Sequence, residues 1–156
     1  MTKLENNWRQ KTLENLEKDY WDKPTYESYL VKRTHEIRKL TLSELTNDDI
    51  AMMLRQLLSL DYIVPLAIDK LKIDILSYCD CGDDGAIMEA IVKLPADFWK
   101  SNNDYWKIIK ELLEENIAVW TFNHDQFDAA MLEWKKAAPN RSVYVIASPY
   151  RENLLA

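Results

Sequence analysis

The sequence predicts a mainly helical protein, a compact domain of about six to seven helices. Apolar residues recur three and four positions apart along most of the chain, as one face of an amphipathic helix requires. The clearest such face is made by Ile50, Leu54, Leu57 and Leu58. Among 156 residues there are only 2 glycines, Gly82 and Gly85. This scarcity excludes Gly-rich phosphate loops, dinucleotide-binding fingerprints and nucleophile elbows.

The N-terminal quarter predicts two amphipathic helices. An imperfect apolar repeat marks the first, made by Leu4, Trp8, Leu13 and Leu16. The second begins at Pro24, because proline is tolerated in a first turn, and runs to about Lys39. Its expected buried stripe is Tyr26, Leu30, Thr34 and Ile37. Its four basic residues are expected to form ion pairs with acidic neighbours, and His35 to lie on a partly packed polar face.

Turn and cap residues divide the middle of the chain. Leu42 and Leu45 are expected to anchor a short turn, after which Thr46-Asn-Asp-Asp49 caps a third helix. Proline disrupts a helix interior. Because of Pro65 we expect a turn near residues 60–63, from which a fourth helix runs to about residue 73.

Two further helices are expected after the loop over residues 77–85. The fifth turns Ile87, Ile91 and Leu94 inward and is stopped by Pro95. The sixth is capped within residues 101–104. Its inward face would comprise Tyr105, Ile108, Ile109, Leu112 and Asn116.

The last forty residues have a different pattern. Residues 117–122 and 143–146 are rich in β-forming residues, and the stretch between them has a capping box and helical spacing. The pattern is compatible with a small strand–helix–strand unit. We therefore expect one domain over residues 1–156, in which 117–156 forms a C-terminal extension.

Acidic residues outnumber basic ones, 26 to 20, which gives a formal net charge of −6. Direct binding to nucleic acid needs a basic surface and is not expected. The excess is concentrated between residues 80 and 128, where eleven acidic residues meet four lysines. Such a region is either a solvated, solubilising surface or a docking face for a basic protein. The composition leaves both interpretations open.

The sequence contains no signal for secretion or for crossing a membrane. Its longest apolar run, residues 62–68, is far shorter than a membrane span. Cys79 and Cys81 are the only cysteines, and with His35 and His124 elsewhere they do not make a metal-ligand set. We expect a soluble cytoplasmic protein with no cofactor, no bound metal and no catalytic residues.

Several short sequence motifs, taken in their order along the chain, resemble those of a known family. They include Asp19-Tyr-Trp21, Ser28-Tyr-Leu-Val31, Leu60-Asp-Tyr-Ile-Val-Pro-Leu-Ala67 and Phe98-Trp99. Over about residues 13–115 this order resembles the immunity proteins of bacterial contact-dependent growth inhibition (CDI) systems, in the group with a helical fold. The loop ending at Gly85 and the segment from about residue 117 depart from the family pattern.

The resemblance implies a protein that is not an enzyme. It would bind the C-terminal toxin domain of its own system's effector inside the cell, as a monomer or a small homo-oligomer. Such toxins are often nucleases, which must be basic to hold phosphates, so an acidic inhibitor is the expected complement. On this hypothesis the toxin-binding face comprises Asp80, Asp83, Asp84, Glu89, Glu111, Glu114 and Glu115, with Tyr105 or Trp106 as aromatic anchors.

Two functions from other classes are alternatives to this hypothesis. One is a helical adaptor with some other protein partner. The other is a small enzyme that uses Cys81 or His124. Gene order separates the adaptor from an immunity protein, because an immunity gene follows its toxin gene. Alanine replacement of both residues tests the enzyme.

Overall fold

In a computed structural model, the structure describes residues 3–80, 84–116, 132 and 134–138. Its α-helices are α1 (Leu13–Glu17), α2 (Tyr29–Ile37), α3 (Asn47–Arg55), α4 (Leu60–Ile73), α5 (Ala86–Val92), α6 (Ala96–Ser101) and α7 (Asn103–Glu115). Two short 3-10 helices accompany them: η1 (Trp8–Gln10) precedes α1, and η2 (Leu42–Glu44) lies between α2 and α3. The prediction of a mainly helical chain is confirmed. The expected strands at 117–122 and 143–146 lie outside the described residues.

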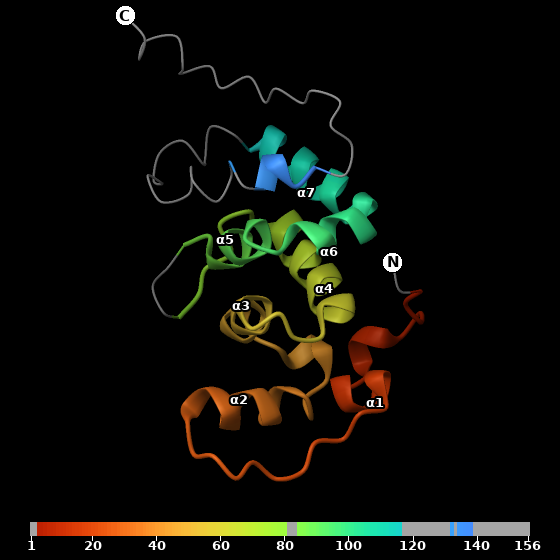
Figure 1. Cartoon of the computed structure of the whole chain (residues 1–156), viewed down its shortest axis with the longest axis vertical. Coiled ribbons are helices and arrows are strands. Elements are labelled where there is room, and N and C mark those ends of the chain that lie inside the picture. The colour runs from red at the N-terminus through yellow and green to blue at the C-terminus, as the bar shows by residue number, and fades with distance from the viewer. Residues whose placement is uncertain (1–2, 81–83, 117–131, 133, 139–156) are drawn as a thin grey trace, which may run out of the picture.

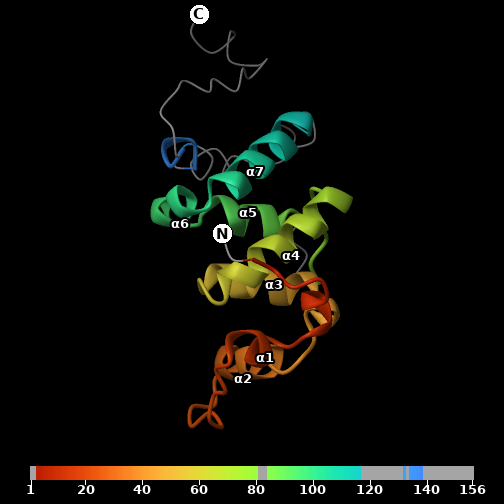
Figure 2. The same cartoon turned by 90° about the vertical axis from the view of Figure 1, so that its right-hand side faces the viewer.

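The helices are stacked along the longest axis of the molecule. Both views place α1 and α2 at one end, α3 to α6 in the middle, and α7 beyond α5 and α6 (Figure 1 and Figure 2). Helix α3 packs against both α4 and α5, and α4 also contacts α7. None of the helices in the described part of the chain is long and apolar enough to cross a membrane.

The core runs through the central helices. Its fully buried side chains include Ile50 and Leu54 of α3, Ile63 of α4, and Ile87 and Ile91 of α5. Burying a side chain of this size stabilises the fold by roughly 1.5–3 kcal/mol. The inward positions predicted at Ile50, Leu54, Ile87 and Ile91 are therefore confirmed. The inward position predicted for Leu57 is wrong: this residue is 51% exposed, because α3 ends at Arg55 and Leu57 turns out of the helix with a φ of 56°.

The expected start of α2 at Pro24 is wrong. The helix begins at Tyr29, because the side chain of Ser28 accepts a hydrogen bond from the Val31 N–H at 3.2 Å and so caps the first turn. Of the predicted stripe, Thr34 and Ile37 are buried, but Tyr26 is 72% exposed and Leu30 is 37% exposed. The segment before Ser28 is a loop that runs beneath α2 in Figure 1.

The sequence also overstates the effect of Pro65. This residue is buried inside α4, which continues through it to Ile73. Proline removes one hydrogen bond of the helical ladder. Here it lies in the second turn, and the burial of its neighbours from Ile63 to Ile68 holds the helix in place. A second difference is α6, a short helix that begins directly after Pro95 and buries Trp99.

The cap predicted for α3 is confirmed. The Thr46 side chain accepts a hydrogen bond from the Asp49 N–H at 3.2 Å, and an Asp49 carboxylate oxygen accepts one from the Thr46 N–H at 3.0 Å. This reciprocal pair is a capping box, which satisfies two donors that a helix start leaves open. The preceding turn is also as expected, because Leu42 and Leu45 are both buried.

A buried arginine connects α1, α2 and the loop between them. Arg38 is 2% exposed. Its Nη1 donates to Glu17 Oε2 at 2.5 Å, its Nη2 donates to the Asp19 carbonyl at 2.8 Å, and its Cζ lies 4.2 Å from the centre of the Trp21 ring. Trp21 in turn meets the His35 ring edge-on at 5.2 Å. Ion pairing of the basic second helix was predicted, and these contacts confirm it.

Candidate functional site

The acidic residues predicted to meet a partner lie on three elements. Asp80 and Asp84 are exposed in the α4–α5 loop (residues 74–85), and Asp83 lies outside the described residues. Glu89 is on α5, close to the end of that loop. The three glutamates of α7 are exposed on its last turns: Glu111, Glu114 and Glu115.

The α4–α5 loop begins with a tight turn. The Asp74 carboxylate accepts the Leu76 N–H at 3.0 Å, and the Asp74 carbonyl accepts both the Ser77 N–H and the Ser77 hydroxyl, at 3.1 and 2.6 Å. Its far end closes on this turn, because the Gly85 N–H donates to the Leu76 carbonyl at 2.6 Å. Gly85 has a φ of 83°, which glycine adopts with little strain.

The first turn of α3 holds the middle of this loop. The Asn47 side-chain amide donates to the Tyr78 carbonyl at 2.8 Å. The Asp48 carboxylate accepts a hydrogen bond from the Asp80 N–H at 2.9 Å. Both bonds reach loop backbone rather than loop side chains. The backbone from Tyr78 to Asp80 is therefore fixed against α3, while the side chains of both residues remain exposed.

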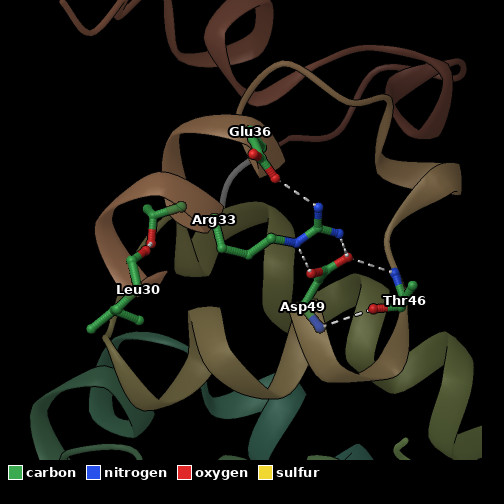
Figure 3. A network of polar contacts seen from close by, with 6 residues as sticks. Leu30, Arg33, Glu36, Thr46 and Asp49 are labelled. Carbon is green, nitrogen blue, oxygen red and sulfur yellow. Dashed lines mark hydrogen bonds and ion pairs between the residues drawn. The ribbon is translucent and has the colours of Figure 1, made fainter. Parts of the chain in front are cut away.

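The first turn of α3 is itself held by α2 (Figure 3). Arg33 donates through Nε and Nη2 to the two carboxylate oxygens of Asp49, both at 2.8 Å, and through Nη1 to Glu36 at 3.0 Å. Burial raises the pKa of Asp49, but hydrogen bonds from Arg33 and Thr46 outweigh burial and leave this pKa below its ordinary value. The same carboxylate raises the pKa of the Arg33 guanidinium.

The acidic residues of the region fall into two groups by their partners. Most acids on the helices pair with a lysine one turn away: Glu89 with Lys93, Asp97 with Lys100, Asp104 with Lys107, and Glu114 with Lys110. No ion pair within the described residues involves Asp80 or Asp84, nor Asp48 or Asp74 beside them. Within the described part of the predicted face, the acidic residues that no ion pair compensates are therefore Asp80 and Asp84 of the α4–α5 loop and Glu111 and Glu115 of α7.

Both predicted aromatic anchors lie in the core. Tyr105 is 8% exposed and Trp106 is 4% exposed. The Trp106 ring stacks on the Trp134 ring, with 4.8 Å between centroids and 16° between planes. Burial, with a smaller effect from Asp61, raises the pKa of Tyr105. Since these side chains leave almost no surface for a partner, their burial argues against an anchoring role.

The exposure of two side chains in and beside the acidic loop was not predicted from the sequence. Ile73 is 85% exposed at the end of α4, and Tyr78 is 61% exposed within the loop. Periodicity could not reveal them. Ile73 comes at the end of an apolar helix, two residues after the buried Leu71, and Tyr78 belongs to a loop without any period. The only sequence signal was the position of Tyr78 among acidic residues.

The residues considered for enzyme chemistry are not brought together in the described part of the chain. Cys79 is buried, and His35 packs against Trp21, whereas Cys81 and His124 lie outside the described residues. Among the residues that the structure describes, no group of three or more His, Cys, Asp or Glu is arranged to hold a metal ion.

Comparison with known proteins identifies the family. No curated protein and no solved structure matches the chain. The family model of the CDI immunity proteins matches residues 15–112, which include α2 to α6 and most of α7. This match agrees with the order of sequence motifs noted above and covers well over half of the chain. The protein therefore belongs to the family of CDI immunity proteins.

Proposed function

We propose that the protein binds the C-terminal toxin domain of its own CDI effector inside the cell and neutralises it without catalysis. We propose further that this toxin is a basic nuclease. Membership of the family supports an immunity role. The choice of a basic toxin rests on one observation, the exposed Asp80 and Asp84 that have no ion-pair partner among the described residues. A nuclease needs positive charge to hold phosphate groups, and complementary charge accelerates association.

The proposed toxin-binding face comprises the acidic residues predicted from the sequence. We expect them to contribute unequally to toxin binding. Asp80 and Asp84 attract a cationic surface directly, and Asp83 is placed with them by sequence. Glu111 and Glu115 add exposed charge on α7. Glu89 and Glu114 share their charge with Lys93 and Lys110, so we expect smaller effects from changing them.

Protection and binding can be measured separately. Cells that express the toxin domain of the same effector should grow when this protein is co-expressed. A catalytically inactive toxin domain should co-purify with it, and the association rate should fall steeply as salt increases. A toxin domain that neither binds nor is neutralised would overturn the proposal.

Charge reversal tests the proposed face. Asp83→Lys with Asp84→Lys should slow toxin association at low salt by about tenfold. Lysine in place of Asp97, which is 93% exposed but paired with Lys100, is the matched control and should change the rate little. Unchanged association of the double variant at low salt would remove the acidic loop from the interface.

A separate double variant addresses catalysis. Cys81→Ala with His124→Ala should protect toxin-expressing cells as well as the original chain does, because the proposal gives neither side chain a chemical role. Loss of protection by a variant that still folds and still binds the toxin would favour an enzymatic mechanism.

A further inference from the structure

We propose that the toxin-binding interface is centred on two exposed apolar side chains, Ile73 and Tyr78. Together with the aspartates around them they form what we name the loop surface: Asp48, Ile73, Asp74, Tyr78, Asp80 and Asp84. This inference rests on the proposed function, and it replaces the buried Tyr105 and Trp106 with anchors that a partner can reach.

The exposure of the two anchors is the first argument. Ile73 is 85% exposed, two residues after the buried Leu71, and Tyr78 is 61% exposed, directly before the buried Cys79. They directly precede and follow the turn over residues 74–77. Tyrosine is enriched among interface residues that contribute most to affinity, and apolar side chains at an interface centre gain from losing water.

Rigidity is the second argument. Hydrogen bonds from Asn47 and to Asp48 fix the backbone of Tyr78 and Asp80, and the bond between Gly85 and Leu76 closes the loop. A partner then binds a segment that is already ordered. Binding therefore loses less conformational entropy than it would with a flexible loop.

The charge of the loop surface indicates what kind of partner it binds. Between residues 70 and 84 the chain has four aspartates and two lysines, and Asp48 adds a fifth acid from α3. The aspartates of the loop surface make no ion pairs within the described residues. Asp48 and Asp74 accept backbone hydrogen bonds, and Asp80 and Asp84 are exposed. A partner with a basic surface and apolar recesses for Ile73 and Tyr78 is the matching chemistry.

A second exposed aromatic segment lies at the α1–α2 end of the molecule and is a weaker candidate. Tyr20, Tyr26 and Tyr29 are 64%, 72% and 78% exposed. Here, however, two of the three neighbouring acids have ion-pair partners, Asp19 with Arg38 and Glu27 with Lys32, and the third, Asp22, is followed by Lys23. This segment offers aromatic surface with less uncompensated charge for a basic toxin.

Binding kinetics of a catalytically inactive toxin domain can distinguish the two surfaces. Ile73→Ser and Tyr78→Ser, singly and together, should weaken affinity by about tenfold or more, mainly through faster dissociation. The matched controls are Leu57→Ser, for an apolar residue that is 51% exposed, and Tyr26→Ser, for a tyrosine that is 72% exposed. Both controls should bind within about twofold of the original chain, and thermal melts should confirm that each variant folds.

The charge of the loop surface is tested separately. Asp80→Asn with Asp84→Asn keeps the side-chain shape and should slow association at low salt, with a smaller effect at high salt. Asp97→Asn with Asp104→Asn removes two paired, exposed charges of α6 and α7 and should leave association nearly unchanged.

The outcomes separate this inference from the proposed function. If the original chain does not bind the toxin domain, the proposed function fails and the loop surface fails with it. If the original chain binds and the Ile73/Tyr78 double variant binds equally well, only the loop surface is overturned. Weaker binding by Tyr26→Ser alone would likewise overturn it, in favour of the second aromatic segment.

Discussion

Single side chains decide how the N-terminal end of this protein is assembled. Arg38 brings a charge into the interior and satisfies it with Glu17, the Asp19 carbonyl and the face of Trp21. These contacts hold a loop that has no regular structure of its own. A buried charge stabilises a fold only while its partners remain, because an uncompensated charge is expensive to bury.

Arg38→Met therefore tests whether this guanidinium supports the fold. We expect the free energy of unfolding to fall by about 3 kcal/mol, because Glu17 loses its partner in a partly buried site. Urea denaturation measures this change. Arg9→Met is the control: Arg9 pairs with Asp69, but both side chains are well exposed, so the loss should stay below about 1 kcal/mol. Equal losses for both variants would contradict the role given to Arg38.

Asp49 predicts a specific dependence of stability on pH. Its pKa in the folded protein lies below the ordinary value of 3.8. The ionised carboxylate therefore stabilises the fold above about pH 4, and this contribution is lost as the pH falls below 3.8 toward the lower folded value. Asp49→Asn should reduce stability at pH 7 by about 2 kcal/mol and flatten its decline in acid. Denaturation midpoints that fall in parallel from pH 6 to pH 2 would contradict this prediction.

At the scale of the helices, features that depend on a few neighbouring residues could be predicted from the sequence. Features that depend on packing between helices could not. The capping box of Thr46 and Asp49 is read directly from four residues, and α3 begins there. The start of α2 was missed because Pro24 and Ser28 are both valid start signals, and only the structure shows that Ser28 caps the helix. Pro65 was misjudged because packing around α4, which outweighs one lost hydrogen bond, is not visible in local sequence.

The candidate site shows the same division. The acidic loop could be predicted, because Asp80 and Asp84 cluster with both glycines of the chain. The exposure of Tyr78 could not be predicted, although helical spacing did place Tyr105 on an inward face. Tyr105 lies in the apolar face of α7 that packs into the core, whereas Tyr78 follows the turn that carries the chain out of α4. Exposure of this kind depends on how the helices pack.

The contact between α3 and the α4–α5 loop yields an element-level prediction. Asn47→Ala removes the hydrogen bond to the Tyr78 carbonyl, so amide hydrogen exchange in residues 76–80 should accelerate severalfold. Toxin dissociation should also become faster, while the melting temperature changes by only a few degrees. Asn15→Ala, at an exposed position of α1, is the control. Unchanged exchange in the loop would show that Asn47 does not order it.

For the molecule as a whole, the core extends beyond α7. Trp134 and Ala137 are buried together with residues from α3 to α7. We propose that residues 132 and 134–138 fold in one domain with the helices that precede them. The net charge of −6 likewise belongs to the whole chain, but several acidic residues of the helices are paired with lysines.

Trp134→Ala tests this extent of the core. Trp134 is 1% exposed and stacks on Trp106, so we expect the free energy of unfolding to fall by about 3 kcal/mol. Leu132→Ala, two residues away and 51% exposed, should cost less than about 1 kcal/mol. Chemical denaturation followed by circular dichroism measures both. If Trp134→Ala is as stable as the original chain, residues 132–138 are not part of the core.

The way in which the α4–α5 loop is fastened has a consequence for how recognition can change. The bonds from Asn47, to Asp48 and between Gly85 and Leu76 all end on loop backbone. Residues 78 and 80 can therefore be exchanged without loosening the attachment, provided that Asn47, Asp48 and Gly85 remain. Substitutions at these two loop positions can therefore change partner specificity while the helices that hold the loop keep their stability.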